Sequence, residues 1–251
     1  MPEPAPAWRG DWRLLERHGP PATLVATLPD PAGRRLACLA HPSGGAVVLG
    51  SAQASAEFDA DHCARAGLEL VKRRSGGGAV VVLPGAQVWL DLFVPVSDQL
   101  FDTDVVRASS FVGALWCDAL VAATGTSAGL AVHASGLVET AWSRRICFSG
   151  IGPGELSRGG RKVTGLAQRR DRTGAWFFTM ALVRTEQHRL ASLLAVEARE
   201  AVVIETSLEA ETAIAGCPAG ELERALAAGL GGAWSPGEDV PAEPHPGERE
   251  D

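Results

Sequence analysis

The sequence lacks the cysteine and histidine patterns that bind metals, form disulfide frameworks or build hydrolase triads. Its 5 cysteines are an odd number, widely separated, without a Cys-x-x-Cys pair or zinc-finger spacing to a histidine. His62, His133 and His188 share no spacing that suggests a metal site or a Ser-His-acid relay. The Gly-x-Ser-x-Gly elbow is also missing, because Gly152 stands at the serine position of segment 150–154. We therefore expect reduced thiols, no metal site and no serine hydrolase.

The sequence also shows no pattern typical of a secretory signal or of a membrane span. Residues 1–9 are rich in proline and have no basic segment followed by an apolar one. The longest apolar region, 105–124, carries Arg107 and Asp118, which would be costly in hydrocarbon. We expect a packed helix there, no contact with a membrane, and a cytoplasmic protein.

An excess of positive charge is absent as well. With 23 Lys and Arg against 30 Asp and Glu, the formal net charge is -7, so no overall field favours nucleic acid or an anionic membrane.

At 251 residues and 46% hydrophobic content the chain can bury a sizeable core, and we expect one domain over residues 1–234. Beyond Trp234 the sequence turns to Pro, Glu, Gly and Asp, which predicts a disordered acidic tail over 235–251.

Short apolar runs bounded by glycine and proline alternate with helical patterns along the chain. Strands are predicted over 46–50, 68–72, 79–83, 87–94, 145–148, 162–169, 175–183 and 201–204. Helices are predicted over 59–66, 104–123, 186–199 and 220–230. Asp104 is expected to cap the longest helix and Gly125 to end it, while segment 149–160 is expected to be a glycine-rich loop.

A glycine triplet follows two arginines between two of these predicted strands, which we expect to pair. The segment is Arg73-Arg74-Ser75-Gly76-Gly77-Gly78-Ala79. Consecutive glycines suit a backbone that approaches a ligand closely, and their N–H groups together with guanidinium groups suit a phosphate or an activated carboxyl group. The alternative is a wide hairpin turn beside a solvated basic pair.

Lys162 stands in the second polar motif, Arg161-Lys162-Val163-Thr164-Gly165. In a continuous strand, alternation would place Lys162, Thr164 and Leu166 on one face. A fixed ammonium beside a reacting acyl group would stabilise the negative charge that develops on its oxygen. The alternative is a lysine that only faces solvent.

Cys147 follows two cations and precedes the glycine-rich loop. Positive charge from Arg144 and Arg145 would favour the thiolate, which is the form that attacks thioesters. The alternative is a cysteine that packs as a small hydrophobe. That is the role expected of the other cysteines, Cys38, Cys63, Cys117 and Cys217.

Three segments in this order resemble the lipoate-protein ligase A and octanoyltransferase family of the biotin/lipoate protein ligase superfamily. They are Val48-Leu49-Gly50-Ser51-Ala52-Gln53, the segment 73–80, and the segment 160–169. The resemblance spans roughly residues 46–183. It implies an α+β fold with a mixed, mostly antiparallel sheet flanked by helices. It also implies that residues 73–79, Thr164 and Gly165 contact the acyl group while Lys162 holds its carbonyl.

The resemblance implies two activities, both ending on a lysine of a lipoyl carrier domain. Transferases of the family take an octanoyl group from acyl carrier protein onto a cysteine and need no cofactor, whereas ligases activate lipoate with ATP and Mg²⁺. Cys147 precedes the lysine motif, and its position is similar to that of the cysteine in the octanoyltransferases. The short tail also leaves no room for the accessory domain of many ligases. We therefore expect transfer through a Cys147 thioester, with ATP-dependent ligation as the alternative.

Several positions depart from the family pattern, among them Ser51 and the segment 176–179. Ser51 stands where the family commonly has arginine, and Trp176-Phe177-Phe178-Thr179 replaces a strand that usually contains His-Gly. These departures predict a reshaped pocket. They also leave a further alternative open, namely a homologue that binds an acyl group or a carrier domain without catalysis.

Overall fold

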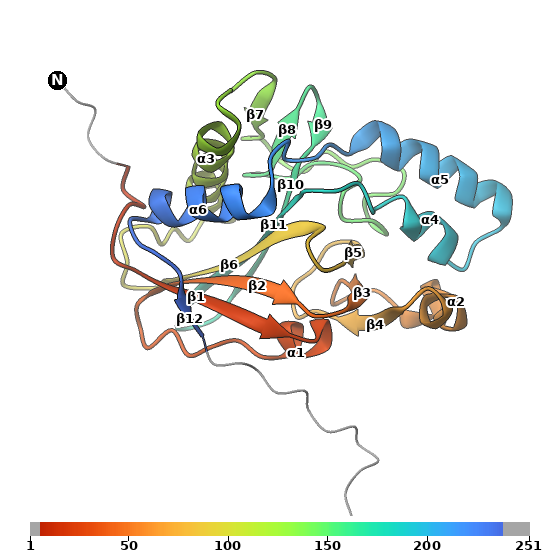
Figure 1. Cartoon of the computed structure of the whole chain (residues 1–251), viewed down its shortest axis with the longest axis horizontal. Helices are drawn as coiled ribbons and strands as arrows, with labels where there is room; N and C mark the ends of the chain where they lie inside the picture. Colours follow the sequence, from red (N-terminus) through yellow and green to blue (C-terminus); the bar gives the residue numbers. More distant parts are fainter. Residues whose placement is uncertain (1–5, 238–251) are drawn as a thin grey trace, which may run out of the picture.

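A six-stranded mixed sheet forms the centre of the fold (Figure 1). The computed structural model describes residues 6–237. In spatial order the strands are β10 (Thr164–Arg170), β11 (Gly174–Leu182), β6 (Gln87–Pro95), β2 (Arg35–Pro42), β1 (Trp12–Gly19) and β12 (Ser235–Pro236). Neighbours are antiparallel from β10 to β2 and parallel from β2 to β12. The predicted α+β class, with a mixed and mostly antiparallel sheet, is confirmed.

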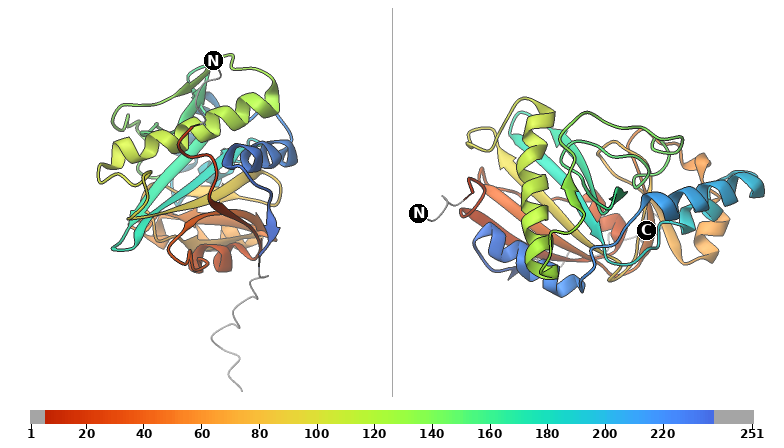
Figure 2. Two further views of the ribbon diagram at one scale, coloured as in Figure 1. Left: turned by 90° about the vertical axis from the view of Figure 1, so that its left-hand side faces the viewer. Right: turned by 90° about the horizontal axis from the view of Figure 1, so that it is seen from above.

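Two helices cover one face of this sheet, as Figure 2 shows from the side and from above. They are α3 (Val105–Thr124) and α6 (Ala219–Leu230). Strand β6 is buried on both faces, and its residues alternate between them. Leu90 and Leu92 pack in the core beneath α3 and α6, whereas Trp89 belongs to a second core on the opposite face.

The opposite face meets α1 (Pro21–Ala26) and a small sheet. That sheet has the order β4 (Leu68–Lys72), β3 (Gly45–Leu49), β5 (Val80–Val82). A third sheet comprises β7 (Leu130–Val132), β8 (Leu156–Arg158) and β9 (Arg161–Lys162). The remaining helices are a 3-10 turn (Ser55–Glu57), α2 (Ala60–Arg65), α4 (Arg189–Leu193) and α5 (Ala198–Glu211). The core is thus divided between the two faces of the central sheet.

Helix α3 begins and ends where the sequence predicts. The Asp104 side chain accepts hydrogen bonds from the N–H groups of Val106 and Arg107, and Gly125 ends the helix at a φ of 71°. By length and composition α3 could cross a membrane. Its apolar face instead packs in the core, where Trp116 is 1% exposed.

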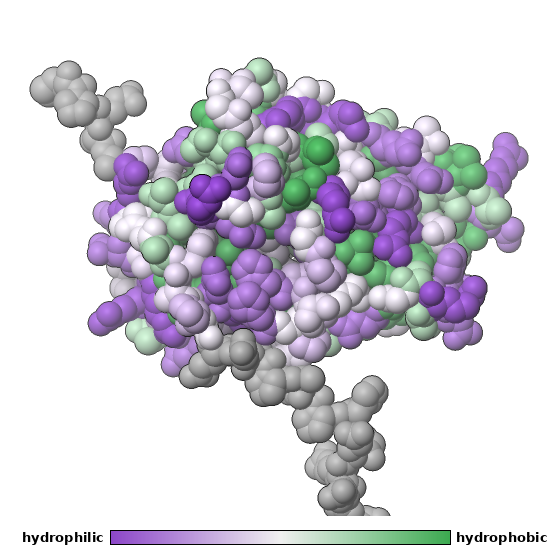
Figure 3. All heavy atoms as spheres, viewed as in Figure 1, coloured by the Kyte–Doolittle hydropathy of each residue, from purple (hydrophilic) through white to green (hydrophobic). Residues whose placement is uncertain are grey.

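Polar residues are spread over the face of the molecule in Figure 3, with apolar residues in small groups between them.

The glycine triplet does not connect a hairpin, contrary to the sequence prediction. Strands β4 and β5 lie on either side of β3, parallel and antiparallel to it respectively. The loop between them therefore crosses over the end of β3. Its position depends on a third strand, which local sequence does not reveal.

The strand predicted around the lysine motif is also interrupted. Val163 separates β9 from β10, so Lys162 pairs with Ser157 while Thr164 pairs with Ala181 of another sheet. The predicted continuous strand is wrong for this reason. The predicted loop 149–160 contains the strand β8, which forms a hairpin with β9 directly after the loop.

Three further predictions are corrected. The predicted strand 145–148 is a turn with one bridge from Ile146 to Ala79. The predicted strand 201–204 lies inside α5, and the predicted helix 186–199 is divided between α4 and α5. Ser235–Pro236 form β12, and positions 238–251 of the predicted disordered tail lie outside the described residues.

Candidate active site

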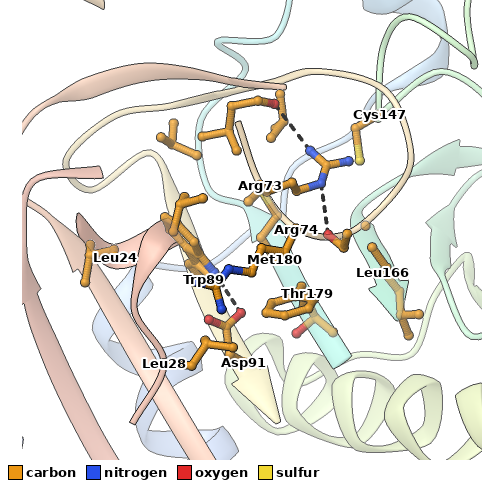
Figure 4. Close-up of a pocket in the computed structure, with 18 residues that line it drawn as sticks. Leu24, Leu28, Arg73, Arg74, Trp89, Asp91, Cys147, Leu166, Thr179 and Met180 are labelled. Carbon is orange, nitrogen blue, oxygen red and sulfur yellow. Dashed lines mark hydrogen bonds between the residues drawn. The ribbon is translucent and has the colours of Figure 1, made fainter. Parts of the chain in front are cut away.

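A pocket lies between the central sheet and the β4-β3-β5 sheet (Figure 4). Apolar side chains form most of its wall, among them Leu24, Leu28, Val80, Val82 and Met180. Figure 4 shows Cys147 and Asp91 in different parts of the wall, with the apolar side chains between them. An apolar pocket with a few placed polar groups is the usual form of a small-molecule site.

The backbone of Cys147 is held from both sides. Its N–H donates to the carbonyl oxygen of Ala79 at 2.8 Å, and its own carbonyl accepts from Lys162 Nζ at 2.6 Å. A Cβ added to Gly165 would lie 3.4 Å from Cys147 Sγ, so the thiol lies directly over this glycine of β10. The half-buried thiol is therefore fixed at the pocket wall.

Arg73 binds the glycine loop itself. Its guanidinium donates to the carbonyl oxygens of Gly76 at 2.7 Å and Gly78 at 2.9 Å, and to Ser75 Oγ at 3.1 Å. Burial lowers the pKa of Arg73, and the neighbouring Cys147 acts in the opposite direction. Figure 4 shows this guanidinium beside the Cys147 sulfur. Arg73 thus fixes the loop and places a cation near the thiol.

Close packing explains why glycine is needed at one position of this loop. A Cβ on Gly78 would lie 2.4 Å from the backbone nitrogen of Ile146, whereas a Cβ on Gly76 would meet nothing within 4 Å. Ala79 N–H also donates to the Arg145 carbonyl at 2.8 Å. The loop is therefore packed tightly against the segment that carries Cys147.

Lys162 is buried in an ion pair. Its Nζ lies 2.7 Å from Glu155 Oε2, and both side chains are 6% exposed. The Glu155 carboxylate also accepts from the N–H groups of Gly152 at 2.7 Å and Leu166 at 2.8 Å. Two of the three ammonium protons are thus used, one by Glu155 and one by the Cys147 carbonyl.

Asp91 is a buried carboxyl group in the pocket wall. Trp89 Nε1 donates to its Oδ1 at 2.9 Å, and the residue is 1% exposed. Burial raises the pKa of Asp91 to about 7, because the charged form is deprived of water, although the Trp89 hydrogen bond acts in the opposite direction. Its neighbour on β2, Cys38, has its pKa raised to about 12, first by burial and then by Asp91. Asp91 and Cys38 are thus both deeply buried.

The structure brings only some of the predicted site residues together. The pocket wall includes Arg73, Arg74, Ser75, Cys147 and Gly165. The remaining predicted residues, which are Gly76, Gly77, Gly78, Ala79, Lys162 and Thr164, support this wall from behind or beside it. Thr164 Oγ1, for example, accepts from the Leu156 N–H at 2.8 Å.

The segments that depart from the family pattern lie at the same pocket. Phe178 and Thr179 line it, and Ser51 N–H donates to the Ser75 carbonyl at 2.9 Å. Sequence reasoning missed Asp91 and Glu155. Asp91 could have been found, because it is the only charged residue in the apolar run 87–95.

Comparisons with solved structures show the fold. Lipoate-protein ligase A bound with ATP matches with a TM-score of 0.67 and 17% identity, over 91% of this chain and 89% of that one. A bipartite lipoate protein ligase from Thermoplasma acidophilum, solved with its E2 lipoyl domain, gives 0.65 and 18% identity, over 91% and 87%. A further T. acidophilum structure, of a protein with bound lipoic acid, gives a TM-score of 0.62 and 18% identity, over 91% and 89%.

A family model extends these fold matches to the sequence. No curated protein matches the chain significantly. The model of the lipoyl protein ligase A/B catalytic domain matches residues 22–211, which include both polar motifs, Cys147 and nearly all of the pocket wall. On this match the chain belongs to the lipoyl protein ligase A/B catalytic domain family, whose ligases and transferases act in protein lipoylation.

Proposed function

We propose that this protein transfers an octanoyl or lipoyl group from acyl carrier protein to a lysine of a lipoyl carrier domain, through a thioester on Cys147. The observation that carries the proposal is the position of Cys147, whose thiol lines an apolar pocket and whose backbone is held by Ala79 and Lys162. A nucleophile fixed beside a bound acyl chain needs little reorganisation before it attacks.

The chemistry proceeds in two balanced steps. The Cys147 thiolate attacks the donor thioester carbonyl, the carbon–sulfur bond to the carrier breaks, and the carrier leaves as a thiol after taking a proton. The neutral amine of the acceptor lysine then attacks the enzyme thioester, forms an amide, and releases Cys147, while the amine loses one proton. Neither step consumes ATP.

Cations around Cys147 support both steps. Arg73 is half-buried beside the thiol, and its guanidinium fixes the glycine loop that packs against the Cys147 segment. Arg74 is exposed at the pocket wall, where it can attract the phosphate of a carrier's prosthetic arm. Lys162 holds the Cys147 carbonyl, and its third N–H is the donor proposed for the developing oxyanion.

ATP-dependent ligation is the second candidate. It is favoured by the structural similarity to lipoate-protein ligase A, which was solved with ATP. In that case the glycine loop would hold an acyl-adenylate and Cys147 would only pack. Mg²⁺ is usually held by carboxylates together with phosphates. Among the described residues of the pocket wall, Asp91 offers the only carboxylate, and it lies away from the glycine loop. We therefore favour the cofactor-independent transferase.

The test is the mass of a lipoyl domain after incubation with the enzyme under two conditions. One mixture contains octanoyl-acyl carrier protein without ATP, and the other contains free octanoate or lipoate with ATP and Mg²⁺. Transfer predicts acylated lipoyl domain in the first mixture. Modification only in the second mixture would identify a ligase, and modification in neither would favour a binding protein without catalysis.

Cys147→Ser and Cys117→Ser form a matched pair for this assay. Both thiols are half-buried, but Cys117 lies on α3, away from the pocket wall. Cys147→Ser should lower the transfer rate at least a hundredfold, roughly the scale of losing a catalytic group. Cys117→Ser should retain transfer. Equal rates in the two variants would contradict the thioester route.

A further inference from the structure

One feature of the pocket is not explained by a plain octanoyl or lipoyl tail. Asp91 places a carboxyl group in a wall that is otherwise largely apolar, and it is 1% exposed. Its Oδ1 accepts from Trp89 Nε1, whereas no donor within the described residues reaches its Oδ2. A saturated acyl tail packed against Asp91 would deprive the carboxyl group of water without replacing that water by a donor, which is costly.

No cation among residues 6–237 forms an ion pair with Asp91. The charge of Arg17 lowers the pKa of Asp91, yet the Arg17 guanidinium donates its hydrogen bonds to the carbonyl oxygens of Leu24 and Thr27. The neighbours of Asp91 across the sheet are Cys38 and Phe178. When an acyl chain fills the pocket and displaces water, a partner for this carboxyl group would have to come from the bound molecule.

Strand register gives the separation between Asp91 and the thiol. Cys147 Sγ lies over Gly165, which pairs with Met180, and Met180 pairs with Trp89 two residues before Asp91. Two strand spacings and two residues along β6 amount to roughly 12 Å. A thioester on Cys147 with an extended acyl chain of medium length would therefore end close to Asp91.

We infer that the acyl group bound here carries a hydroxyl or another neutral hydrogen-bond donor at its distal end, and that the Asp91 carboxyl accepts from it. This inference rests on the proposed function, since it names the acyl substrate of the same pocket. Asp91 is then the residue that determines specificity, because it selects a polar-ended chain over plain octanoyl. A site built around a substrate hydroxyl discriminates strongly against an analogue without it.

Calorimetric binding of two free acids tests this inference without requiring catalysis. The probes are ω-hydroxyoctanoate and octanoate, titrated into the native protein, Asp91→Leu and Asp91→Asn. The native protein should bind ω-hydroxyoctanoate roughly tenfold more tightly, the scale of one buried hydrogen bond. Asp91→Leu, of similar size and apolar, should prefer octanoate. Asp91→Asn keeps an acceptor oxygen and should retain part of the native preference.

Three results would overturn the inference: equal or tighter native binding of octanoate, an unchanged preference in both variants, or no binding of either acid. If Asp91→Leu fails to fold, judged by circular dichroism, Asp91→Asn decides alone.

The acids are also titrated into Cys147→Ser. A preserved preference there, combined with no acyl-enzyme on the native protein, would contradict the transfer mechanism and leave the Asp91 inference standing. Acylation of the native protein by octanoyl donors, without any preference for the hydroxyl acid, would support the transfer mechanism and overturn the Asp91 inference.

Discussion

At the scale of single residues, the buried Lys162–Glu155 pair determines how Cys147 is presented. The pair lies 2.7 Å apart at 6% exposure, and Lys162 also holds the Cys147 carbonyl. Removing one member leaves the other as an unpaired buried charge. Replacing both leaves no charge behind. The pair is therefore a positioning device for the Cys147 backbone.

Lys162→Met should destabilise the protein by about 3–5 kcal/mol, because Glu155 loses its cation. The double variant Lys162→Met with Glu155→Gln should recover much of that loss. Urea unfolding monitored by circular dichroism measures both. The control is Lys72→Met, since Lys72 is exposed and its removal should change stability little. A double variant at least as unstable as Lys162→Met alone would contradict the buried-pair account.

At the scale of elements, the glycine loop and the Cys147 segment support each other. The loop crosses the end of β3, and Gly78 approaches the Ile146 backbone more closely than a side chain would allow. The Arg73 guanidinium holds the loop carbonyls from the other side. Displacing the loop should therefore also displace the thiol.

Gly78→Ala tests this coupling. The added Cβ meets backbone at 2.4 Å, so the free energy of unfolding should fall by about 1–3 kcal/mol or more, and acylation of Cys147 should slow. Gly76→Ala is the matched control, because its Cβ meets nothing within 4 Å. Thermal melts and acylation rates of the two variants provide the comparison. Similar behaviour of both variants would show that the close contact does not position the thiol.

Local signals predicted elements well, and long-range contacts account for the errors. The Asp104 cap, the Gly125 stop and strand β4 follow from neighbouring residues and agree with the structure. Residues 201–204 have strand propensity, but α5 buries Ile204 and Leu208, four residues apart on one helix face, so tertiary packing prevails.

The candidate site shows the same division between local and distant information. The motifs identified the arginines and Cys147, which line the pocket. The partner of Lys162 was not predictable, because Glu155 meets it only across the β8–β9 turn. Asp91 reaches the pocket because alternation along β6 places it on the same face of the central sheet as Trp89, and the chain must first fold into that sheet between β2 and β11.

At the scale of the whole molecule, Asp91 makes stability depend on pH. Burial raises its pKa to about 7, above the ordinary value for an unfolded chain, so the folded state holds the proton more tightly. This contribution to stability is fully present below the unfolded pKa. It is lost as the pH rises through about 7.

Asp91→Asn removes that dependence, because the amide does not titrate. Relative to the native protein, the variant should gain stability on the order of 2 kcal/mol more at pH 8 than at pH 5. Urea titrations at the two pH values measure the difference. Asp61→Asn, which removes an exposed carboxylate on α2, should show no such gain. A difference for Asp91→Asn that grows towards low pH would contradict the assignment.

The most direct test of the central claim is the intact mass of the protein after incubation with octanoyl-acyl carrier protein in the absence of ATP. The account predicts that the native chain gains one octanoyl group, that hydroxylamine removes it as expected of a thioester, and that Cys147→Ser gains none. A native chain that gains no mass, or a Cys147→Ser variant that is acylated equally, would contradict the Cys147 thioester.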